Sequence, residues 1–356
     1  MSRIDTFLEL LVKQDGSDLH MVSGNPPRIR MHGELIAVKY RELSAAETMG
    51  LVSEIMPAAA RSAFEDRSSI DFAYAVDGLA RFRVNVYRHV NGVGAVLRVI
   101  PADIKTMESL GLPPVLASFC QQKKGLVLCT GPTGSGKSTS LAALIDHVNS
   151  TRKGHILTME DPIEFVHRNK LSLVSQREVG FDTKSFAAAL HSALREDPNV
   201  ILVGEMRDLE TIALAVTAAE TGTLVFGTLH TNGAAATVDR IVNVFPPGEQ
   251  GRIRSMLSTS LLGVMSQQLV RRSDGKGRVA ALEILVNNPA VANILRDGKT
   301  EQIGTAIQSG SLQGMQSMDT ALKRVLDARQ IVGRDAYRKA IDKKLFDMYA
   351  VPDLAA

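Results

Sequence analysis

The sequence predicts an α/β protein in two parts. An N-terminal α+β domain is followed by a doubly wound, mostly parallel sheet with a helical C-terminal region. Before residue 100, short strand and helix signals alternate, and one strand alternates polar with apolar residues. From Gly125 onward, apolar strands alternate with amphipathic helices, as in sheets covered by helices on both faces. The length of 356 residues also favours two domains over one.

The N-terminal domain, residues 1–100, contains a clear strand–turn–strand signal. Residues 81–88 place apolar side chains on one face of a strand and polar ones on the other. Asn91-Gly92 favours a tight turn, and Val93 to Ile100 forms the next strand. We therefore expect an antiparallel sheet whose half-exposed face carries Arg81, Arg83, Asn85 and Tyr87.

A linker is expected at residues 101–114, which contain Gly111 and three prolines. The second domain then covers residues 115–356. Its helices are expected at 137–149, at 185–195, and from an Asp208 N-cap to a stop at Gly222. Beyond Pro247 the pattern is mainly helical, with a hairpin around 271–286. The predicted strands of this domain are 125–130, 155–159, 200–203 and 223–228.

Residues 131–138 read Gly-Pro-Thr-Gly-Ser-Gly-Lys-Ser, a phosphate-binding loop between a strand and a helix. Its glycines let backbone N–H groups converge on phosphate oxygens, and the helix N-terminus favours negative charge. Lys137 should reach the β- and γ-phosphates of ATP, and the Ser138 hydroxyl should bind Mg²⁺. The alternative is a chance glycine-rich turn. The expected nucleotide-binding residues are Gly131, Pro132, Thr133, Gly134, Ser135, Gly136, Lys137, Ser138 and Thr139.

Such a loop needs an acid on a neighbouring strand to hold the metal ion or its water. Glu205 meets this need because it follows the apolar strand Val200 to Val203. Gly204 stands where an aspartate is common, so the motif is atypical. A purely structural glutamate at a strand end is the alternative.

Two other strand ends carry polar side chains. Glu160 and Glu164 follow the strand at 155–159, at the edge of the sheet where α/β proteins bind ligands. Their carboxylates could polarise an attacking water and steady Mg²⁺, or they could belong to a solvated acidic turn. His230 ends the apolar run 224–229 at another strand edge, and we expect it near the γ-phosphate, although a lone histidine is often structural.

The bulk composition narrows the possible partners. Lys and Arg total 41 against 38 Asp and Glu, and this net charge of +3 is too small to indicate nucleic acid. Cys120 and Cys129 show no metal-binding or disulfide spacing, and Cys129 is expected in the core. No secretory signal is visible, and no stretch approaches the roughly 18 apolar residues of a membrane span. We expect a cytoplasmic protein that reaches the membrane only through a partner.

Taken together, four segments of the chain resemble the Walker A, Asp, Walker B and His boxes of the type II/type IV secretion ATPases. Shorter likenesses occur at 16–20 and 296–300, and the resemblance covers roughly residues 5–345. The four segments are, in order, 131–138, 160–164, 203–208 and 227–232.

The resemblance implies a PAS-like N-terminal domain, a RecA-like ATPase domain and a hexameric ring with ATP between domains. Glu164 matches the family's general base, and Glu205 matches its Walker B acid. N-terminal arginines of the family contact phosphates, although arginines here could merely solubilise a sheet face. The matching candidates are Arg81, Arg83, Arg88 and Arg98.

Within the superfamily, absent elements favour pilus retraction over extension or secretion. Extension and secretion ATPases usually carry an extra N-terminal region and a four-cysteine zinc element, whereas this chain has two cysteines. It also begins almost directly at the PAS-like domain. We therefore expect a hexameric Mg-ATP-hydrolysing motor of type IV pilus retraction and twitching motility. Its expected partner is an inner-membrane platform protein, and an accessory retraction paralogue would look similar.

Two other classes of protein share some of these features. A RecA-like nucleic-acid translocase needs a basic channel and aromatic stacking residues, but aromatics are 4% of this chain and tryptophan is absent. A nucleotide-sensing scaffold without activity is expected to lose the acids near the γ-phosphate, and these are all present. Neither nucleic-acid binding nor a purely structural role is therefore expected.

Overall fold

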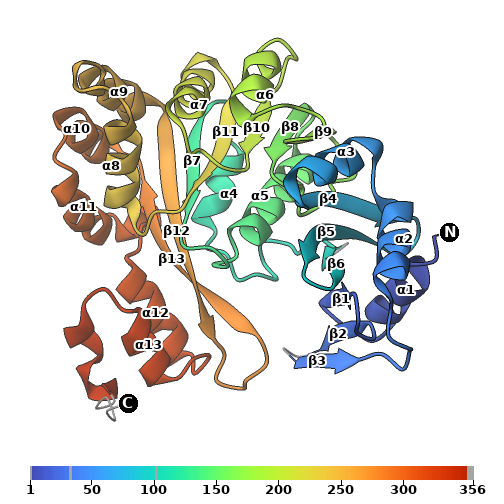
Figure 1. Ribbon diagram of the computed structural model, residues 1–356. Coiled ribbons are helices and arrows are strands. Elements are labelled where there is room, and N and C mark those ends of the chain that lie inside the picture. Colours follow the sequence, from blue (N-terminus) through green and yellow to red (C-terminus); the bar gives the residue numbers. More distant parts are fainter. Residues whose placement is uncertain (1, 32–33, 101–102, 351–356) are drawn as a thin grey trace. The chain divides into compact units, whose positions relative to one another are not determined.

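The computed structural model describes residues 2–31, 34–100 and 103–350, and the chain divides into two compact units (Figure 1). Unit 1 comprises Met1–Asp103 and Pro162–Val166, and unit 2 comprises Ile104–Asp161 and His167–Ala356. The first two residues of the expected linker, 101 and 102, lie outside the described residues. The rest of it from Ile104 belongs to unit 2, where Met107 and Leu112 are buried in the core.

Within the described part of unit 1, six strands form one antiparallel sheet in the order β3-β2-β1-β6-β5-β4. Three helices, α1 (Asp5–Lys13), α2 (Ala45–Ile55) and α3 (Ala58–Arg67), contribute to the hydrophobic core of this unit. The strands are β1 (Asp18–Val22), β2 (Arg28–Met31), β3 (Glu34–Ala37), β4 (Ser69–Val76), β5 (Ala80–His89) and β6 (Gly92–Ile100).

The predicted hairpin is confirmed as β5 and β6, which pair antiparallel around the turn before Gly92. Phe82, Val84 and Val86 are fully buried, whereas Arg81, Arg83 and Asn85, which alternate with them, are half-exposed. The apolar face of the sheet therefore meets the core, and its polar face carries the arginine side chains.

In the described part of unit 2, seven strands form a sheet in the order β13-β12-β7-β11-β10-β8-β9. All neighbouring pairs are parallel except β12 with β13, which confirms the predicted mostly parallel sheet. The strands are β7 (Gly125–Thr130), β8 (His155–Glu160), β9 (Leu173–Glu178), β10 (Val200–Val203), β11 (Leu224–Leu229), β12 (Leu261–Arg271) and β13 (Arg278–Val286).

The helices of unit 2 cover both faces of this sheet. Alternate residues of each central strand pack into two different hydrophobic clusters. In β7, Leu126 and Leu128 pack with the cluster of α6 to α11, whereas Val127 and Cys129 pack with the cluster of α4 and α5. This alternation is what a doubly wound sheet requires. The helices are α4 (Val115–Cys120), α5 (Lys137–Thr151), α6 (Phe186–Ala193), α7 (Leu209–Thr221), α8 (Ala234–Val244), α9 (Pro247–Ser260), α10 (Pro289–Asp297) and α11 (Ile303–Ser309).

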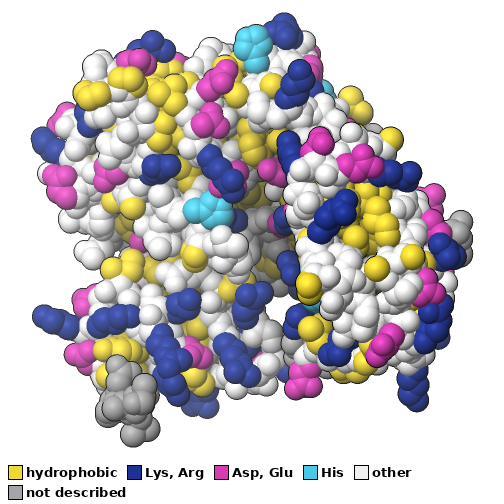
Figure 2. Space-filling view, in the orientation of Figure 1, with side chains coloured by type: hydrophobic (Ala, Val, Ile, Leu, Met, Phe, Trp, Pro, Cys, Tyr) yellow, Lys and Arg dark blue, Asp and Glu magenta, His cyan; other side chains and the backbone are white. Residues whose placement is uncertain are grey.

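The C-terminal helices α12 (Met318–Asp327) and α13 (Gly333–Lys339), with the 3₁₀ segment Lys343–Tyr349, form a smaller core against β12 and β13. Lys and Arg side chains gather over this part of the surface in Figure 2. Two shorter 3₁₀ turns, Thr300–Gln302 and Ser311–Gln313, lie between α10 and α12. Within the described residues, no helix combines the length and apolar character that a membrane crossing requires.

Two strands of unit 2 were not predicted in full. The hairpin was expected from about residue 271, but β12 already begins at Leu261, directly after α9 ends at Ser260. No proline or glycine separates the two, so the sequence carries no visible break there. The edge strand β9 was missed because its residues are mostly polar and only its last one is buried.

Candidate phosphate-binding and hydrolysis site

The loop at 131–136 joins β7 to α5 at the carboxyl edge of the sheet. Gly131 and Gly136 have φ angles of 137° and 85°, which other residues rarely adopt. At Gly131 a Cβ would also collide with the carbonyl oxygen of Gln267. The glycine pattern is therefore required by the path of the backbone.

Lys137, the first residue of α5, is buried, with 9% of its surface exposed. Its ammonium donates hydrogen bonds to the carbonyl oxygens of Gly131, at 2.7 Å, and Pro132, at 3.1 Å. The loop therefore curls around the lysine and holds its charge beside the first backbone N–H groups of the helix. Both features suit an anion at this place.

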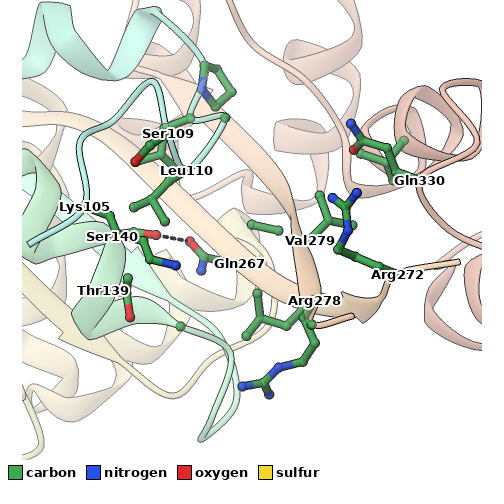
Figure 3. A pocket seen from close by; sticks show the side chains of 18 of the residues that line it. Lys105, Ser109, Leu110, Thr139, Ser140, Gln267, Arg272, Arg278, Val279 and Gln330 are labelled. Atoms are coloured by element: carbon green, nitrogen blue, oxygen red, sulfur yellow. Dashed lines mark hydrogen bonds between the residues drawn. The ribbon is translucent and has the colours of Figure 1, made fainter. Parts of the chain in front are cut away.

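Gln267 of β12 holds the same loop through hydrogen bonds (Figure 3). No motif in the sequence predicted this role. Its amide nitrogen donates to the carbonyl oxygen of Ser135 and its amide oxygen accepts from the hydroxyl of Ser140, both at 2.7 Å. The side chain is only 2% exposed. Since both of its polar ends are satisfied by the loop and α5, Gln267 fixes the loop in one conformation.

Gln267→Ala is expected to raise the KM for ATP about tenfold with a smaller change in kcat. The substitution leaves buried polar groups of Ser135 and Ser140 without partners, which costs about 1–3 kcal/mol and loosens the binding loop. Gln268→Ala is the matched control, because Gln268 is the next residue of β12 and makes no side-chain hydrogen bond among the described residues. Steady-state kinetics giving the same KM for both variants would contradict this role.

The strand order brings the predicted catalytic residues to one edge of the sheet. β7, β11, β10 and β8 are parallel neighbours, and their carboxyl ends lead to the loop, His230, Glu205 and Glu160 respectively. His230 Nε2 lies 3.1 Å from Glu205 Oε1, and Arg207 contacts that same oxygen. The structure therefore places His230 and Glu205 in direct contact.

Glu160 and Glu164 are placed differently from each other. Glu160 Oε1 accepts hydrogen bonds from Thr158 Oγ1 at 2.6 Å and Gln176 Nε2 at 3.2 Å. Its carboxylate is thus fixed by β8 and β9. Glu164 is exposed, and its segment Pro162–Val166 groups with unit 1, so the acidic residues expected at one edge are divided between the units.

The predicted Mg²⁺ ligands are Ser138 and Glu205. Both offer oxygen atoms, which Mg²⁺ prefers, and the ion commonly takes its other ligands from phosphates and water. Among the described residues, no three or more His, Cys, Asp or Glu side chains form a group that could hold a metal ion. The two oxygen donors fit a Mg²⁺ that takes its other ligands from a nucleotide and water.

A cavity of about 810 Å³ opens beside the start of α5 (Figure 3). Its wall combines Lys105 and the segment 108–114, Gly136 of the loop, Thr139 and Ser140 of α5, the hairpin of β12 and β13, and α12. Arg278 also donates to the carbonyl oxygen of Gly134 at 3.4 Å. This volume suits a small organic ligand, and its position beside the loop suits the base and sugar of a nucleotide.

The candidate arginines of unit 1 are split between the two faces of its sheet. Arg83 and Arg98 lie directly opposite each other on β5 and β6, and Arg81 shares their face two residues before Arg83. Arg88 has the opposite parity, and its guanidinium carbon lies 5.1 Å from the centre of the buried Phe64 ring. Arg81, Arg83 and Arg98 therefore form one group that excludes Arg88.

Asp18 balances part of this arginine face. It is 4% exposed and pairs with Arg98 Nε at 2.7 Å and with Arg30 Nε at 3.8 Å. Burial raises the pKa of Asp18, but the hydrogen bonds from Ser17 and Arg98 outweigh it and hold the pKa below its usual value. Asp18 is thus charged at neutral pH and orients the arginine side chains.

Comparison with known proteins decides the family. Residues 1–315 match the family described as Type II/IV secretion system protein. The chain belongs to this family.

Two relatives and one solved structure carry names that concern pilus retraction or twitching motility. The chain is 51% identical to a protein of Pseudomonas aeruginosa named Type IV pilus retractation ATPase PilT, over 94% of this chain and 97% of that protein. It is 52% identical to the Twitching motility protein of Neisseria gonorrhoeae, over 88% of this chain and 84% of that protein. A solved structure of the pilus retraction motor PilT with bound ADP superposes with a TM-score of 0.91 at 43% identity, covering 98% of this chain and 99% of that one.

These similarities confirm the predicted α/β fold, the ATPase activity, nucleotide binding and the assignment to pilus retraction. The roles of single residues and the use of Mg²⁺ stay predictions.

Proposed function

We propose that this chain is a hexameric motor that hydrolyses Mg-ATP at its phosphate-binding loop and thereby powers retraction of type IV pili. The observation that carries the proposal is the 51% identity, over nearly the whole chain, to a pilus retraction ATPase. The loop that holds Lys137 and the contact between Glu205 and His230 support it from the geometry.

The nucleotide is proposed to lie across two neighbouring parts of unit 2. Its base and sugar enter the cavity between residues 105–114 and the β12–β13 hairpin, and its phosphates lie over the loop. Lys137 offsets the phosphate charge, while Ser138 and Glu205 would hold Mg²⁺, which would supply further neutralisation of the phosphate charge. Thr139 lines the cavity at its junction with the loop.

Hydrolysis needs a base for the attacking water and a group that responds to the γ-phosphate. Glu164 is proposed as the base, as its match to the family's Asp box implies. His230, held against Glu205 at 3.1 Å, is proposed to contact the γ-phosphate. Since Glu205 also contacts Arg207, loss of the γ-phosphate would change the electrostatic environment of His230, Glu205 and Arg207 together.

The arginine face of unit 1 supplies the proposed link between subunits. Arg81, Arg83 and Arg98 share one face of the sheet, where Arg83 pairs with Asp71 and Arg98 with Asp18. Guanidinium groups bind phosphate oxygens in a bidentate way, so we propose that these arginines reach a nucleotide across a subunit boundary of the hexamer. Closure and release of this contact would drive a platform protein at the inner face of the cytoplasmic membrane.

Deleting the gene in a piliated strain tests the direction of work. The strain is expected to keep, or over-display, surface pili that no longer shorten when single labelled pili are imaged. Complementation with the wild-type gene should restore shortening. If the deletion instead removed pili altogether, the chain would be an extension motor.

A further inference from the structure

The loop that follows His230 is held by side chains from three other elements. The backbone N–H of Gly233 donates to the hydroxyl of Ser266 on β12 at 2.9 Å. The next N–H, of Ala234, donates to Glu283 Oε1 on β13 at 2.8 Å. Thr237 of α8 donates to the carbonyl oxygen of Gly233 at 2.7 Å. The backbone at 233 and 234 is thus fixed by a polar network, in addition to the apolar packing of Ala234 in the core.

Glu283 is the charged member of this network and it serves two helices. Its side chain also accepts a hydrogen bond from the backbone of Met318. Ala234 and Met318 are the first residues of α8 and α12, so one carboxylate satisfies the N-terminal N–H of both helices. The residue is only 8% exposed.

The same network reaches the phosphate-binding loop. The hydroxyl of Thr237 lies 2.7 Å from that of Thr231 and 3.5 Å from that of Thr130. Thr130 is the last residue of β7, directly before Gly131, and both Thr130 and Thr237 are fully buried. Glu283 therefore lies at the far end of a chain of contacts that begins beside the nucleotide loop.

Keeping a carboxylate at this position has a cost in folding free energy. Burial raises the pKa of Glu283, and the backbone hydrogen bonds only partly oppose it. As pH rises above the usual pKa of a glutamate, the native state holds its proton longer than the unfolded state. Stability therefore falls with rising pH across that window. The charged carboxylate is therefore less favourable in the folded protein than the protonated one, and its presence at neutral pH invites an explanation from function.

We propose that Glu283 is a positioning residue for ATP hydrolysis, which fixes the loop 231–234 so that His230 stays against Glu205. By bonding to Met318 as well, it ties the position of this loop to α12 and the C-terminal helices. The inference rests on the proposed role of His230.

The test compares Glu283→Gln with Gln316→Ala. The glutamine keeps one acceptor oxygen but turns an N–H group toward one of the two helix N-termini, so the loop loses an anchor. The variant is expected to lose about tenfold in kcat, because small displacements of catalytic groups slow turnover, with nucleotide affinity within about twofold of wild type. Its melting temperature at pH 7 should not fall.

Gln316 is the matched control because it bonds to the strand residue next to Glu283. Its amide nitrogen donates to the carbonyl oxygen of Leu282 at 2.7 Å and its amide oxygen accepts from Arg324 at 3.3 Å, and no hydrogen bond joins it to the loop 231–234 in the described structure. Gln316→Ala should therefore keep its kcat. Equal kcat losses in both variants, or a kcat loss in Glu283→Gln that merely follows a lower melting temperature, would overturn the inference.

A double substitution shows whether Glu283 acts through His230. The variant with both Glu283→Gln and His230→Ala should be no slower than His230→Ala alone, because coupled residues are not additive. Additive losses would overturn the inference while leaving the motor function intact. Normal turnover in His230→Ala would overturn the inference, because Glu283 is proposed to act through His230. Absence of ATP hydrolysis by the wild-type protein would instead refute the proposed function.

Discussion

Glu164→Gln is expected to bind ATP as tightly as the wild type while its turnover falls by about 100-fold or more. The amide keeps the size and polarity of the side chain but cannot take a proton from the attacking water. Binding of a fluorescent nucleotide and steady-state release of phosphate measure the two effects separately. A loss confined to kcat is what removal of a general base produces.

The neighbouring acid offers a control for charge. Asp161 is exposed and lies three residues before Glu164 in the sequence, so Asp161→Asn removes the same charge nearby in the chain. It should stay close to wild type in turnover. If Glu164→Gln also hydrolysed ATP normally, the role of base would pass to Glu160, whose carboxylate is fixed by Thr158 and Gln176, or to Glu205.

Lys137→Ala is expected to weaken nucleotide binding by about 100-fold and to abolish measurable turnover at cellular ATP concentrations. The ammonium is the buried charge of the loop, and charge-assisted hydrogen bonds to phosphate are worth about 1.5–3 kcal/mol each. Isothermal titration with ADP and with a non-hydrolysable ATP analogue measures the loss.

Lys124→Ala controls for the loss of a lysine near the same strand. Lys124 is exposed, directly precedes β7, and donates to the carbonyl oxygen of Glu220 at 3.3 Å. Its substitution should leave affinity unchanged. Wild-type affinity in Lys137→Ala would show that the nucleotide binds elsewhere, and the assignment of the whole loop would fail with it.

Local signals were sufficient for much of the fold. The predicted strands at 125–130 and 200–203 agree with β7 and β10 to the residue, since short apolar runs bounded by polar residues define buried strands. Helix α7 begins after Asp208, whose side chain accepts from the N–H of Thr211, and ends before Gly222. In each case the information lies within a few residues of the boundary.

Contacts between distant residues were not accessible in the same way. Ser140 and Gln267 are 127 positions apart, and nothing near Gln267 marks it as a partner of the loop. The cavity is assembled from segments separated by more than 100 residues, and Glu283 resembles any polar residue in an apolar strand. Such residues gain their roles from the order of strands in the sheet, which a motif does not encode.

For the arginines of unit 1, the periodicity of the sequence predicted which side chains share a face of a strand, but not their partners on other strands. The alternation in β5 correctly separated Arg81 and Arg83 from Arg88, because side chains alternate between the faces of a strand. It could not show that Arg98 lies opposite Arg83, or that Asp18 pairs with Arg98 from a third strand. Which arginine contacts a nucleotide stays a prediction for the assembled ring.

The central claim is that ATP hydrolysis by this chain pulls pili in. The most direct test is the shortening speed of single labelled pili in a strain whose only copy of the protein carries Glu164→Gln. The account predicts that pili are present and that shortening slows in proportion to the turnover measured for the purified variant. Shortening at the wild-type speed, with turnover reduced about 100-fold, would contradict the account.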